Sequence, residues 1–327
     1  GPAGMATSLT LTARGVPHIV VEAQTEPVRK PGEALPPNAK PLLRQLGIEY
    51  LLQHEAHLPY YGNQSAWKGT ALSEENFLKD VHGNGFLLDR LHFEKQLREV
   101  IQAPLLTGYR LQSVSRSDSG VKLHVENDHK RLDMEARYIV DATGRKASVC
   151  RHLDIHQTSV DDWFALWFHI KGKAPAQIFI ESTSLGWWYV APFGKEELTV
   201  MFFTRKPHLP QQTGRLLHLQ EQFKEANELN RMFSLSPLSS SAIRIRPCGT
   251  SCLDIPYGDA WVAVGDAAYA YDPISSFGIT SALAGGYYAG NALADTLEGN
   301  PNALPVYRYI MENAFQAYLK KLETLYV

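Results

Sequence analysis

The segment from Ala260 to Ala284, AWVAVGDAAYAYDPISSFGITSALA, constrains the fold of this chain more than any other part of the sequence. Its apolar start, Trp261–Val264, is typical of a buried strand, and a Gly-Asp pair, a second loop and a helix of small residues follow. A carboxylate after a strand can bind a sugar hydroxyl, and the free N–H groups of a helix start can face a phosphate or an anionic ring. The segment therefore predicts a site for a phosphorylated cofactor. Its candidate contacts are Gly265, Asp266, Pro273, Gly278 and Ile279.

Length, charge and cysteine content narrow the class of protein. The chain has 327 residues, enough for a large core and two intertwined domains. A formal net charge of −2 gives no basis for binding nucleic acid or an anionic membrane. No apolar run reaches the roughly 18 residues that span a bilayer, so we expect a cytoplasmic protein. Cys248 and Cys252 lack a second ligand pair, so we expect no metal site.

The N-terminal segment carries part of a dinucleotide-binding pattern. A predicted helix, Met5–Ala13, follows a Gly-Pro-Ala-Gly start, and His18–Glu22 is typical of a buried strand. Gly1 and Gly4 fit the second and third glycines of the pattern G-x-G-x-x-G, and Glu22 follows at the distance of the acid that binds a ribose hydroxyl. A Gly-Pro start can also be the remnant of a cleaved tag. Because the first strand and first glycine are missing, we expect the native protein to begin earlier. Because the amphipathic C-terminal helix ends abruptly, we also expect the chain to continue past it. The candidate contacts are Gly1, Pro2, Ala3, Gly4 and Glu22.

The next segments alternate turns with short elements. Asn38 is expected to cap a helix over Ala39–Leu46, and residues 53–85 have little periodicity and many aromatic and histidine side chains, as in loops that cover a bound ligand. A further helix is predicted over Leu91–Val100, directly after Arg90. A cation is electrostatically unfavourable at a helix start, so a phosphate partner would account for Arg90.

Residues 105–140 are predicted to form a β-meander with strands at Leu105–Val114, Val121–Val125 and Met134–Val140. The last strand leads into the sequence D-A-T-G, where glycine allows the backbone to approach a cofactor closely. The candidate contacts in this turn are Asp141, Thr143 and Gly144.

From Trp163 onward the pattern changes to antiparallel strands rich in Trp and Phe, followed by a polar helix, Gln211–Met232, and a strand, Ser241–Arg246. Helices over Thr280–Leu297 and Pro305–Leu325 close the chain. The predicted fold class is α/β, with a Rossmann-like cofactor-binding domain that includes the meander and a substrate domain built on a mostly antiparallel β-sheet. The predicted boundaries are 1–52, 84–154 and 249–327 for the first domain and 53–83 and 155–248 for the second. The predicted strands are Phe164–Ile170, Ile178–Glu181, Trp187–Ala191 and Leu198–Thr204.

Three motifs in this order, GPAG with its acid, D-A-T-G and GDAAYAYDPISSFGI, resemble those of the p-hydroxybenzoate-hydroxylase fold group of FAD-dependent monooxygenases. The segments GEALPP, HGNG, GWW and YDPISS look closest to the tryptophan-halogenase-like branch. Within that branch they are most similar to flavoproteins that mature quinone cofactors in amine and amino-acid oxidases. The resemblance implies FAD as the cofactor and Arg90, in the pattern D-R-x-x-F-x-x-x-L, as a contact of the flavin nucleotide. It also implies hydroxylation of an aromatic group, which in the maturation enzymes is a tryptophan of a partner protein.

The motifs of tryptophan halogenases are present only in part. W-x-W-x-I-P becomes WWYVAP at residues 187–192, and the acidic residue of D-P-x-E-S-T-G-I becomes Ser275. Lys68 lies in the region of the halogenase lysine, but its neighbours do not match. Halogenation loses its two most specific supports, which favours monooxygenation.

The candidate catalytic residues come from one loop and one aromatic strand. The loop can present N–H groups to a flavin ring, and the strand, which includes Tyr189, can wall a pocket that excludes water. An electron-rich ring needs little acid–base assistance, so His82 and His169 are only candidates for proton transfer. The candidate catalytic residues are Ser275, Ser276, Phe277, Trp187 and Trp188.

Three alternatives compete with the monooxygenase. A halogenase predicts a chloride site beside Ser276 and Gly278, a geranylgeranyl-reductase-like flavoenzyme predicts a long apolar tunnel, and a maturation chaperone needs no catalytic flavin. A broad cleft would favour a protein substrate, and a closed cavity would favour a small molecule. Because no second dinucleotide pattern is present, the electrons come from transiently bound NAD(P)H or from a separate flavin reductase.

Overall fold

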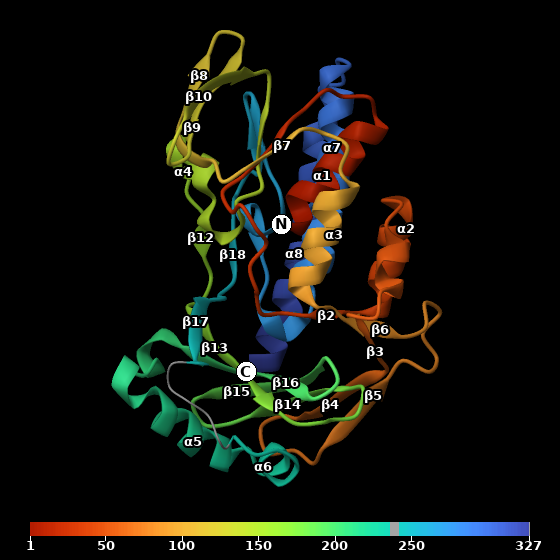
Figure 1. Cartoon of the computed structure of the whole chain (residues 1–327), viewed down its shortest axis with the longest axis vertical. Helices are drawn as coiled ribbons and strands as arrows, with labels where there is room; N and C mark the ends of the chain where they lie inside the picture. The colour runs from red at the N-terminus through yellow and green to blue at the C-terminus, as the bar shows by residue number, and fades with distance from the viewer. Residues whose placement is uncertain (236–241, 327) are drawn as a thin grey trace.

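The computed structural model describes residues 1–235 and 242–326. A helix-rich part and a sheet-rich part lie one above the other along the long axis of the molecule (Figure 1). The C-terminal end of the last helix, α8, points toward the large sheet. The helices of the first part are α1 (Pro2–Ala13), α2 (Lys40–Gln45), α3 (Arg90–Val100), α4 (Ser148–His152), α7 (Gly278–Leu297) and α8 (Ala303–Tyr326).

The Rossmann-like part contains two parallel strand pairs. β1 (Val20–Glu22) pairs with β7 (Leu105–Thr107), and β11 (Ile139–Asp141) pairs with β20 (Trp261–Ala263). β19 (Tyr257–Gly258) adds to β20 in antiparallel orientation. The carboxyl end of each strand of the second pair leads directly into one of the predicted cofactor turns.

The β-meander has the order β10-β9-β8 and is shorter than predicted. The predicted strand Leu105–Val114 is two strands, because the chain turns at Gly108, whose φ is +79°. The predicted strand Met134–Val140 is also two strands, and its second half leaves the meander as β11. The meander strands are β8 (Arg110–Ser117), β9 (Gly120–Glu126) and β10 (Arg131–Ala136).

The sheet-rich part is a seven-stranded sheet in the order β17-β13-β16-β15-β14-β4-β5. All of its pairs are antiparallel except β14 with β4. The expected α/β class with a mostly antiparallel second sheet is therefore confirmed. The strands are β4 (Gly62–Ala66), β5 (Ser73–Asn76), β13 (Trp163–Lys171), β14 (Ile178–Ser182), β15 (Gly186–Phe193), β16 (Glu197–Arg205) and β17 (Arg244–Pro247).

Residues 53–85 are not the loops that the sequence predicted. They supply β4 and β5 to one edge of the large sheet, and β3 (Leu58–Tyr60) and β6 (Gly85–Leu87) to a small sheet with β2 (Ala34–Leu35). The strands at the edge are polar, with all four residues of β5 exposed, so they lack the apolar alternation that identifies a strand in sequence.

Two helix predictions also need correction. Asn38 lies inside a 3-10 turn, and Ala39 is the residue that precedes α2. The predicted helix Gln211–Met232 is two helices, α5 (Arg215–Glu225) and α6 (Asn227–Met232), because the chain leaves helical geometry at Ala226. There the Glu181 carboxylate accepts hydrogen bonds from the first N–H groups of α6, at 2.8 Å from Leu229 N. Part of the predicted strand Ser241–Arg246 lies outside the described residues.

A separate three-stranded sheet has the order β12-β18-β21. Its strands are β12 (Thr158–Ser159), β18 (Ser251–Cys252) and β21 (Tyr269–Ala270).

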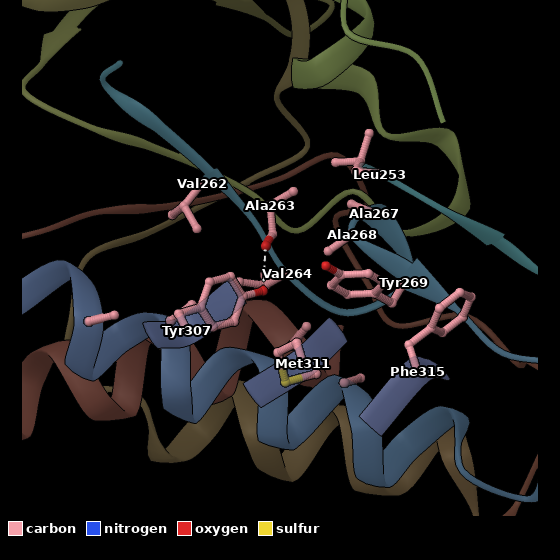
Figure 2. Packing of buried hydrophobic residues seen from close by; sticks show 14 of the residues in the cluster. Leu253, Val262, Ala263, Val264, Ala267, Ala268, Tyr269, Tyr307, Met311 and Phe315 are labelled. Atoms are coloured by element: carbon pink, nitrogen blue, oxygen red, sulfur yellow. Dashed lines mark hydrogen bonds between the residues drawn. The ribbon is translucent and has the colours of Figure 1, made fainter. Parts of the chain in front are cut away.

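The core of the helix-rich part forms between α8 and the segment that contains β20. Figure 2 shows Tyr307, Met311 and Phe315 of α8 packed against the strand and the turn that follows it. The Tyr307 hydroxyl donates a 2.7 Å hydrogen bond to the Ala263 carbonyl, which holds the helix at the end of β20. The predicted strand and turn are thus buried by a helix from the far end of the chain.

Helices α1 and α7 pack with their backbones nearly in contact. A Cβ atom on Gly286 would lie 2.3 Å from the Ala3 carbonyl oxygen and 2.9 Å from Thr7 N. At Gly265, which has a φ of +58°, it would lie 2.8 Å from the Ala3 Cβ. Since real Cβ atoms do not approach so closely, glycine is required at both positions, and the start of α1 lies beside the turn after β20.

We predict that Gly286→Ala destabilises the protein by about 1–3 kcal/mol, although alanine favours helix formation, because the new methyl group meets the backbone of α1. The free energy of unfolding in urea measures this. Gly214→Ala is the control, since a Cβ there meets nothing within 4 Å. An unchanged stability of Gly286→Ala would contradict the close approach of the two helices.

Candidate functional site

Three predicted cofactor segments meet at the start of α1. A Cβ on Gly4 would lie 3.0 Å from the Ala142 side chain in the D-A-T-G turn, and Gly265 lies against Ala3. The start of α1 has no side-chain cap and no acidic residue in its first turn. Its first N–H groups are therefore available to an anion, as the glycine pattern predicted.

Glu22 faces the same helix start from the end of β1. Its Oε2 lies 3.7 Å from the Gly1 amino nitrogen and 3.9 Å from an Arg98 guanidinium nitrogen, and its Oε1 accepts a 3.0 Å hydrogen bond from Gln24 N. The carboxylate is thus held where an acid can reach a ribose hydroxyl.

Asp141 braces the D-A-T-G turn. It is fully buried, and its Oδ1 accepts hydrogen bonds from the Thr143 backbone N–H (2.9 Å) and hydroxyl (2.6 Å). Its Oδ2 accepts a 2.9 Å bond from Cys150 N. The carboxylate and the Thr143 hydroxyl therefore act on the shape of the turn, whereas the backbone of Gly144, at a φ of +68°, forms its outer corner.

Asp266 is the candidate acid of the turn after β20. Its side chain is about one third exposed, and its Oδ2 lies 3.4 Å from Arg145 Nε. Arg145 also donates hydrogen bonds to the carbonyls of Tyr271 (2.7 Å) and Gly249. The guanidinium joins the D-A-T-G turn to both loops of the second motif, and it leaves the carboxylate accessible.

Arg90 belongs to a buried charged group at the start of α3. It donates to the Gly32 carbonyl at 2.8 Å and to Glu94 Oε1 at 2.7 Å, and Lys30 holds Glu94 Oε2 at 2.6 Å. Although burial alone would raise it, these two cations hold the pKa of Glu94 at about 2. Arg90 Nε is buried without a hydrogen-bond partner, so it retains a donor for a ligand.

Hydrogen bonds within the loop before α7 fix its conformation. Asp272 Oδ1 accepts from Ile274 N at 2.8 Å, and the Ser275 hydroxyl bonds to the Asp272 carbonyl at 2.7 Å and accepts from Phe277 N at 3.2 Å. Ser276 has a φ of +53°. Phe277 precedes α7 without a side-chain cap, and the Thr280 hydroxyl in the first turn is buried without a partner. The helix start thus offers N–H groups and a hydroxyl to a bound group.

Trp187 and Trp188 lie on opposite faces of the large sheet, because neighbouring residues of a strand alternate. Trp187 stacks on Phe203 at 3.8 Å on the face toward the helix-rich part. Trp188 is packed against Phe223 of α5, and its Nε1 donates to the Gln222 carbonyl. The prediction that both tryptophans wall one pocket is wrong for Trp188, and Tyr189 shares the face of Trp187.

A small cavity of about 20 Å³ lies between the segment 29–33, the start of α3 and the large sheet. Glu33 is 4% exposed, and its Oε1 lacks a hydrogen-bond partner, as do the Tyr189 hydroxyl, Trp167 Nε1 and His169 Nδ1. Burial raises the pKa of Glu33 to about 7, against the opposing effects of the nearby Tyr189 hydroxyl and the Arg90 charge. His169 lines this cavity, and burial lowers its pKa.

An open groove of about 530 Å³ lies at the other side of the same face. Trp67, Trp163 and Trp187 line it with Tyr326 of α8, and Lys68, Arg205 and His208 supply charge and polarity. His82 lines neither cavity and lies in the turn before β6, where Lys40 Nζ binds its carbonyl at 2.9 Å. In the described part of the chain, no group of three or more His, Cys, Asp or Glu side chains is placed to hold a metal ion.

Sequence reasoning missed three residues of this region. Glu33 could have been identified from the sequence, since it is the one acidic residue in the turn GEALPP and has apolar neighbours. Arg145 follows the D-A-T-G motif directly, but its partners at 249 and 271 are visible only in the fold. Tyr326 carries no signal, because it reaches the groove only through the packing of α8.

Comparison with known proteins identifies the family of this chain. Residues 1–313 match the model of a family described as an FAD binding domain. The oxidoreductase LodB of Marinomonas mediterranea, described as FAD-dependent, is 24% identical over 97% of this chain and 88% of its own. The flavin-dependent halogenase CmlS has the same fold, with a TM-score of 0.86 and 19% identity over 97% of this chain, which spans 61% of CmlS. The peptidyl tryptophan dihydroxylase QhpG, essential for tryptophylquinone cofactor biogenesis, has a TM-score of 0.76 and 22% identity, over 98% of this chain and 71% of QhpG.

The chain belongs to the FAD-binding domain family, and it is an FAD-dependent oxidoreductase. This confirms the expected cofactor and argues against a chaperone without catalytic flavin. The residues present fit FAD, because two uncapped helix starts, a free arginine Nε, a free threonine hydroxyl and an accessible aspartate surround the glycine-packed turns. No helix of the described residues is long and apolar enough to cross a membrane.

We predict that Glu33→Gln stabilises the flavin-free protein at about pH 8 by up to about 3 kcal/mol and leaves its stability unchanged at about pH 4. The folded protein holds the proton of Glu33 more tightly than the unfolded chain does. Stability therefore falls as the pH rises from about 4 to about 7, and the full penalty is present above that range. Urea denaturation at both pH values measures the difference, with exposed Glu55→Gln as the control. Equal stabilities of Glu33→Gln and the wild type at about pH 8 would contradict the conclusion that burial destabilises the ionised form of Glu33.

Proposed function

We propose that this protein is an FAD-dependent monooxygenase that hydroxylates an aromatic group, with a tryptophan side chain of a partner protein or peptide as the substrate. The observation that carries the proposal is the open aromatic groove of Trp67, Trp163 and Trp187. Through Tyr326, it adjoins Asp272, which begins the loop before α7. A groove open to solvent admits a side chain that remains attached to a polypeptide, whereas the reductase alternative predicted a long apolar tunnel.

In the proposed reaction, one oxygen atom of dioxygen replaces a ring hydrogen as a hydroxyl group, and the other leaves as water. Bound FAD supplies this redox chemistry, and NAD(P)H or a separate flavin reductase supplies the two electrons. The chain's own residues bind and orient. The start of α1 and Glu22 would hold the nucleotide, Asp266 and Arg90 would add polar contacts, and the N–H groups of Gly278 and Ile279 would stabilise negative charge on the bound group.

We also propose the two-domain division that the sequence suggested. β4 and β5 join β13 to β17 in one sheet, which supports a substrate domain of 53–83 and 155–248. The remaining segments carry the turns that surround the start of α1 and form the FAD-binding domain. The aromatic face of the sheet is then the face that meets the flavin, and it carries Trp187 but not Trp188.

Halogenation remains the second candidate function, because Lys68 lines the aromatic groove with Trp187. A halogenase of this fold uses a lysine near the substrate, as the sequence resemblance implied. Ser275 stands where the halogenase loop has its acid, and its hydroxyl is bonded to the Asp272 carbonyl. The position of Lys68 favours halogenation and the serine at position 275 opposes it. The chemical identity of the product is therefore needed to distinguish the two functions.

The deciding experiment supplies the FAD-loaded protein with reduced flavin, dioxygen and tryptophan-containing peptides, with and without chloride or bromide. We expect a mass gain of one or two oxygen atoms that does not depend on halide. We also predict that Lys68→Ala retains turnover within about threefold, since the proposed hydroxylation assigns no step to this exposed lysine. Lys79→Ala, an exposed lysine outside the groove, is the control. A halide-substituted product that disappears in Lys68→Ala would establish the halogenase instead.

We predict that Asp266→Asn weakens FAD binding by about 10–100-fold, because a hydrogen bond to a charged group contributes about 1.5–3 kcal/mol. Fluorescence quenching on titration of the apoprotein with FAD measures the dissociation constant. Exposed Asp254→Asn is the matched control. Unchanged FAD affinity of Asp266→Asn, with unchanged melting temperature, would remove Asp266 from the cofactor site.

A further inference from the structure

The side chain of Tyr326, on the last turn of α8, occupies the aromatic groove. Its ring stacks on Trp163, with ring centres 5.1 Å apart and planes at 25°, and lies 5.9 Å from the ring of Trp67. Trp67 in turn lies 6.3 Å from Trp187 and donates its Nε1–H to the Leu325 carbonyl at 3.1 Å. The phenol ring of Tyr326 is therefore surrounded by three indole rings, at distances that are favourable for aromatic pairs. We call the three tryptophans, Trp67, Trp163 and Trp187, the aromatic box.

The hydroxyl of Tyr326 reaches the loop assigned to the flavin. It donates a 3.1 Å hydrogen bond to Asp272 Oδ2, and Asp272 is 1% exposed. The other carboxylate oxygen, Oδ1, already accepts from Ile274 N, and the Asp272 N–H donates to the Tyr318 hydroxyl at 2.7 Å. Trp187 Nε1, buried in the same box, lies beside the Tyr326 hydroxyl but makes no hydrogen bond of normal geometry. The box thus combines aromatic walls with one carboxylate acceptor and one indole donor.

We propose that this box, formed by Trp67, Trp163 and Trp187 with Asp272 Oδ2 as acceptor, is the binding site for a substrate ring that carries an O–H or N–H group. Tyr326 fills the site as an internal ring that the substrate displaces. The inference rests on the proposed function for the statement that the bound ring is a substrate. It specifies phenols and indoles, because a ring without a donor would leave Oδ2 of the buried Asp272 without a hydrogen bond.

The position of Tyr326 permits its displacement. Tyr326 is only partly buried, and the groove that its ring occupies is open to solvent. The rim of the groove is polar: Arg205 lies 5.6 Å above the ring of Trp163 and pairs with Asp162, and His208 and Lys68 line the opening. An aromatic side chain can therefore enter while its attached polypeptide remains among polar groups.

The test measures binding of phenol, indole and toluene to the FAD-loaded protein by titration calorimetry. We expect Tyr326→Ala to bind phenol and indole about tenfold more tightly than the wild type, since the competing internal ring is gone. Toluene, which has no donor, should bind Tyr326→Ala more weakly than phenol does. Tyr309→Ala, an exposed tyrosine on the same helix that does not line the groove, is the control and should match the wild type.

Equal phenol affinities of Tyr326→Ala and the wild type would overturn the displacement, and equal affinities for toluene and phenol would overturn the role of Asp272. Tyr326→Phe keeps the ring and removes only the bond to Asp272, so it tests the same claim if the alanine variant unfolds. We expect Tyr326→Phe to bind phenol a few-fold more tightly than the wild type, and no change would overturn the proposal. Because these titrations need no turnover, ring binding without oxygenated product would count against the proposed function alone.

Discussion

The contact on which the site depends is the close approach of α1 to α7 at Gly286 and to the turn after β20 at Gly265. A single methyl group at either position would meet Ala3. This approach places the start of α1, the D-A-T-G turn and the turn after β20 around one point, although they lie at the beginning, middle and end of the chain. The predicted cofactor residues lie close together only because these glycines have no side chains to separate α1 from α7 and from the turn after β20.

The second constraint is the alternation of side chains along the large sheet. Each strand sends one set of residues to the face covered by α5 and α6, and the other set to the face toward the cofactor turns. The side chains of a run such as Trp187-Trp188-Tyr189 therefore lie in two different environments, one on each face of the sheet. Trp188 fills the core under α5, whereas Trp187 and Tyr189 lie on the face toward the cofactor turns, where their polar atoms have no hydrogen-bond partner of normal geometry.

Much of this arrangement can be predicted from local sequence, and the rest cannot for identifiable reasons. The Gly-Asp turn, the D-A-T-G turn and the long final helices carry strong glycine and periodicity signals, and the structure has them where expected. β4 and β5 were missed because polar strands at a sheet edge have no apolar alternation. The roles of Glu33 and Tyr326 depend on contacts between distant segments, since burial and the lack of a partner belong to the folded chain and not to a motif.

Arg145 has a further consequence for how the molecule tolerates change. Its guanidinium bonds to Asp266 and to two carbonyls, at Gly249, where the chain leaves the large sheet, and at Tyr271, where the loop before α7 begins. Only a planar group with several fixed donors can make all three contacts at once, so lysine cannot replace it. This one side chain therefore links the turn after β20, the segment that leaves the large sheet and the loop before α7. A shift of the sheet would reach the flavin loop through this side chain as a movement of backbone, and substitutions far from the site could alter the site by that route.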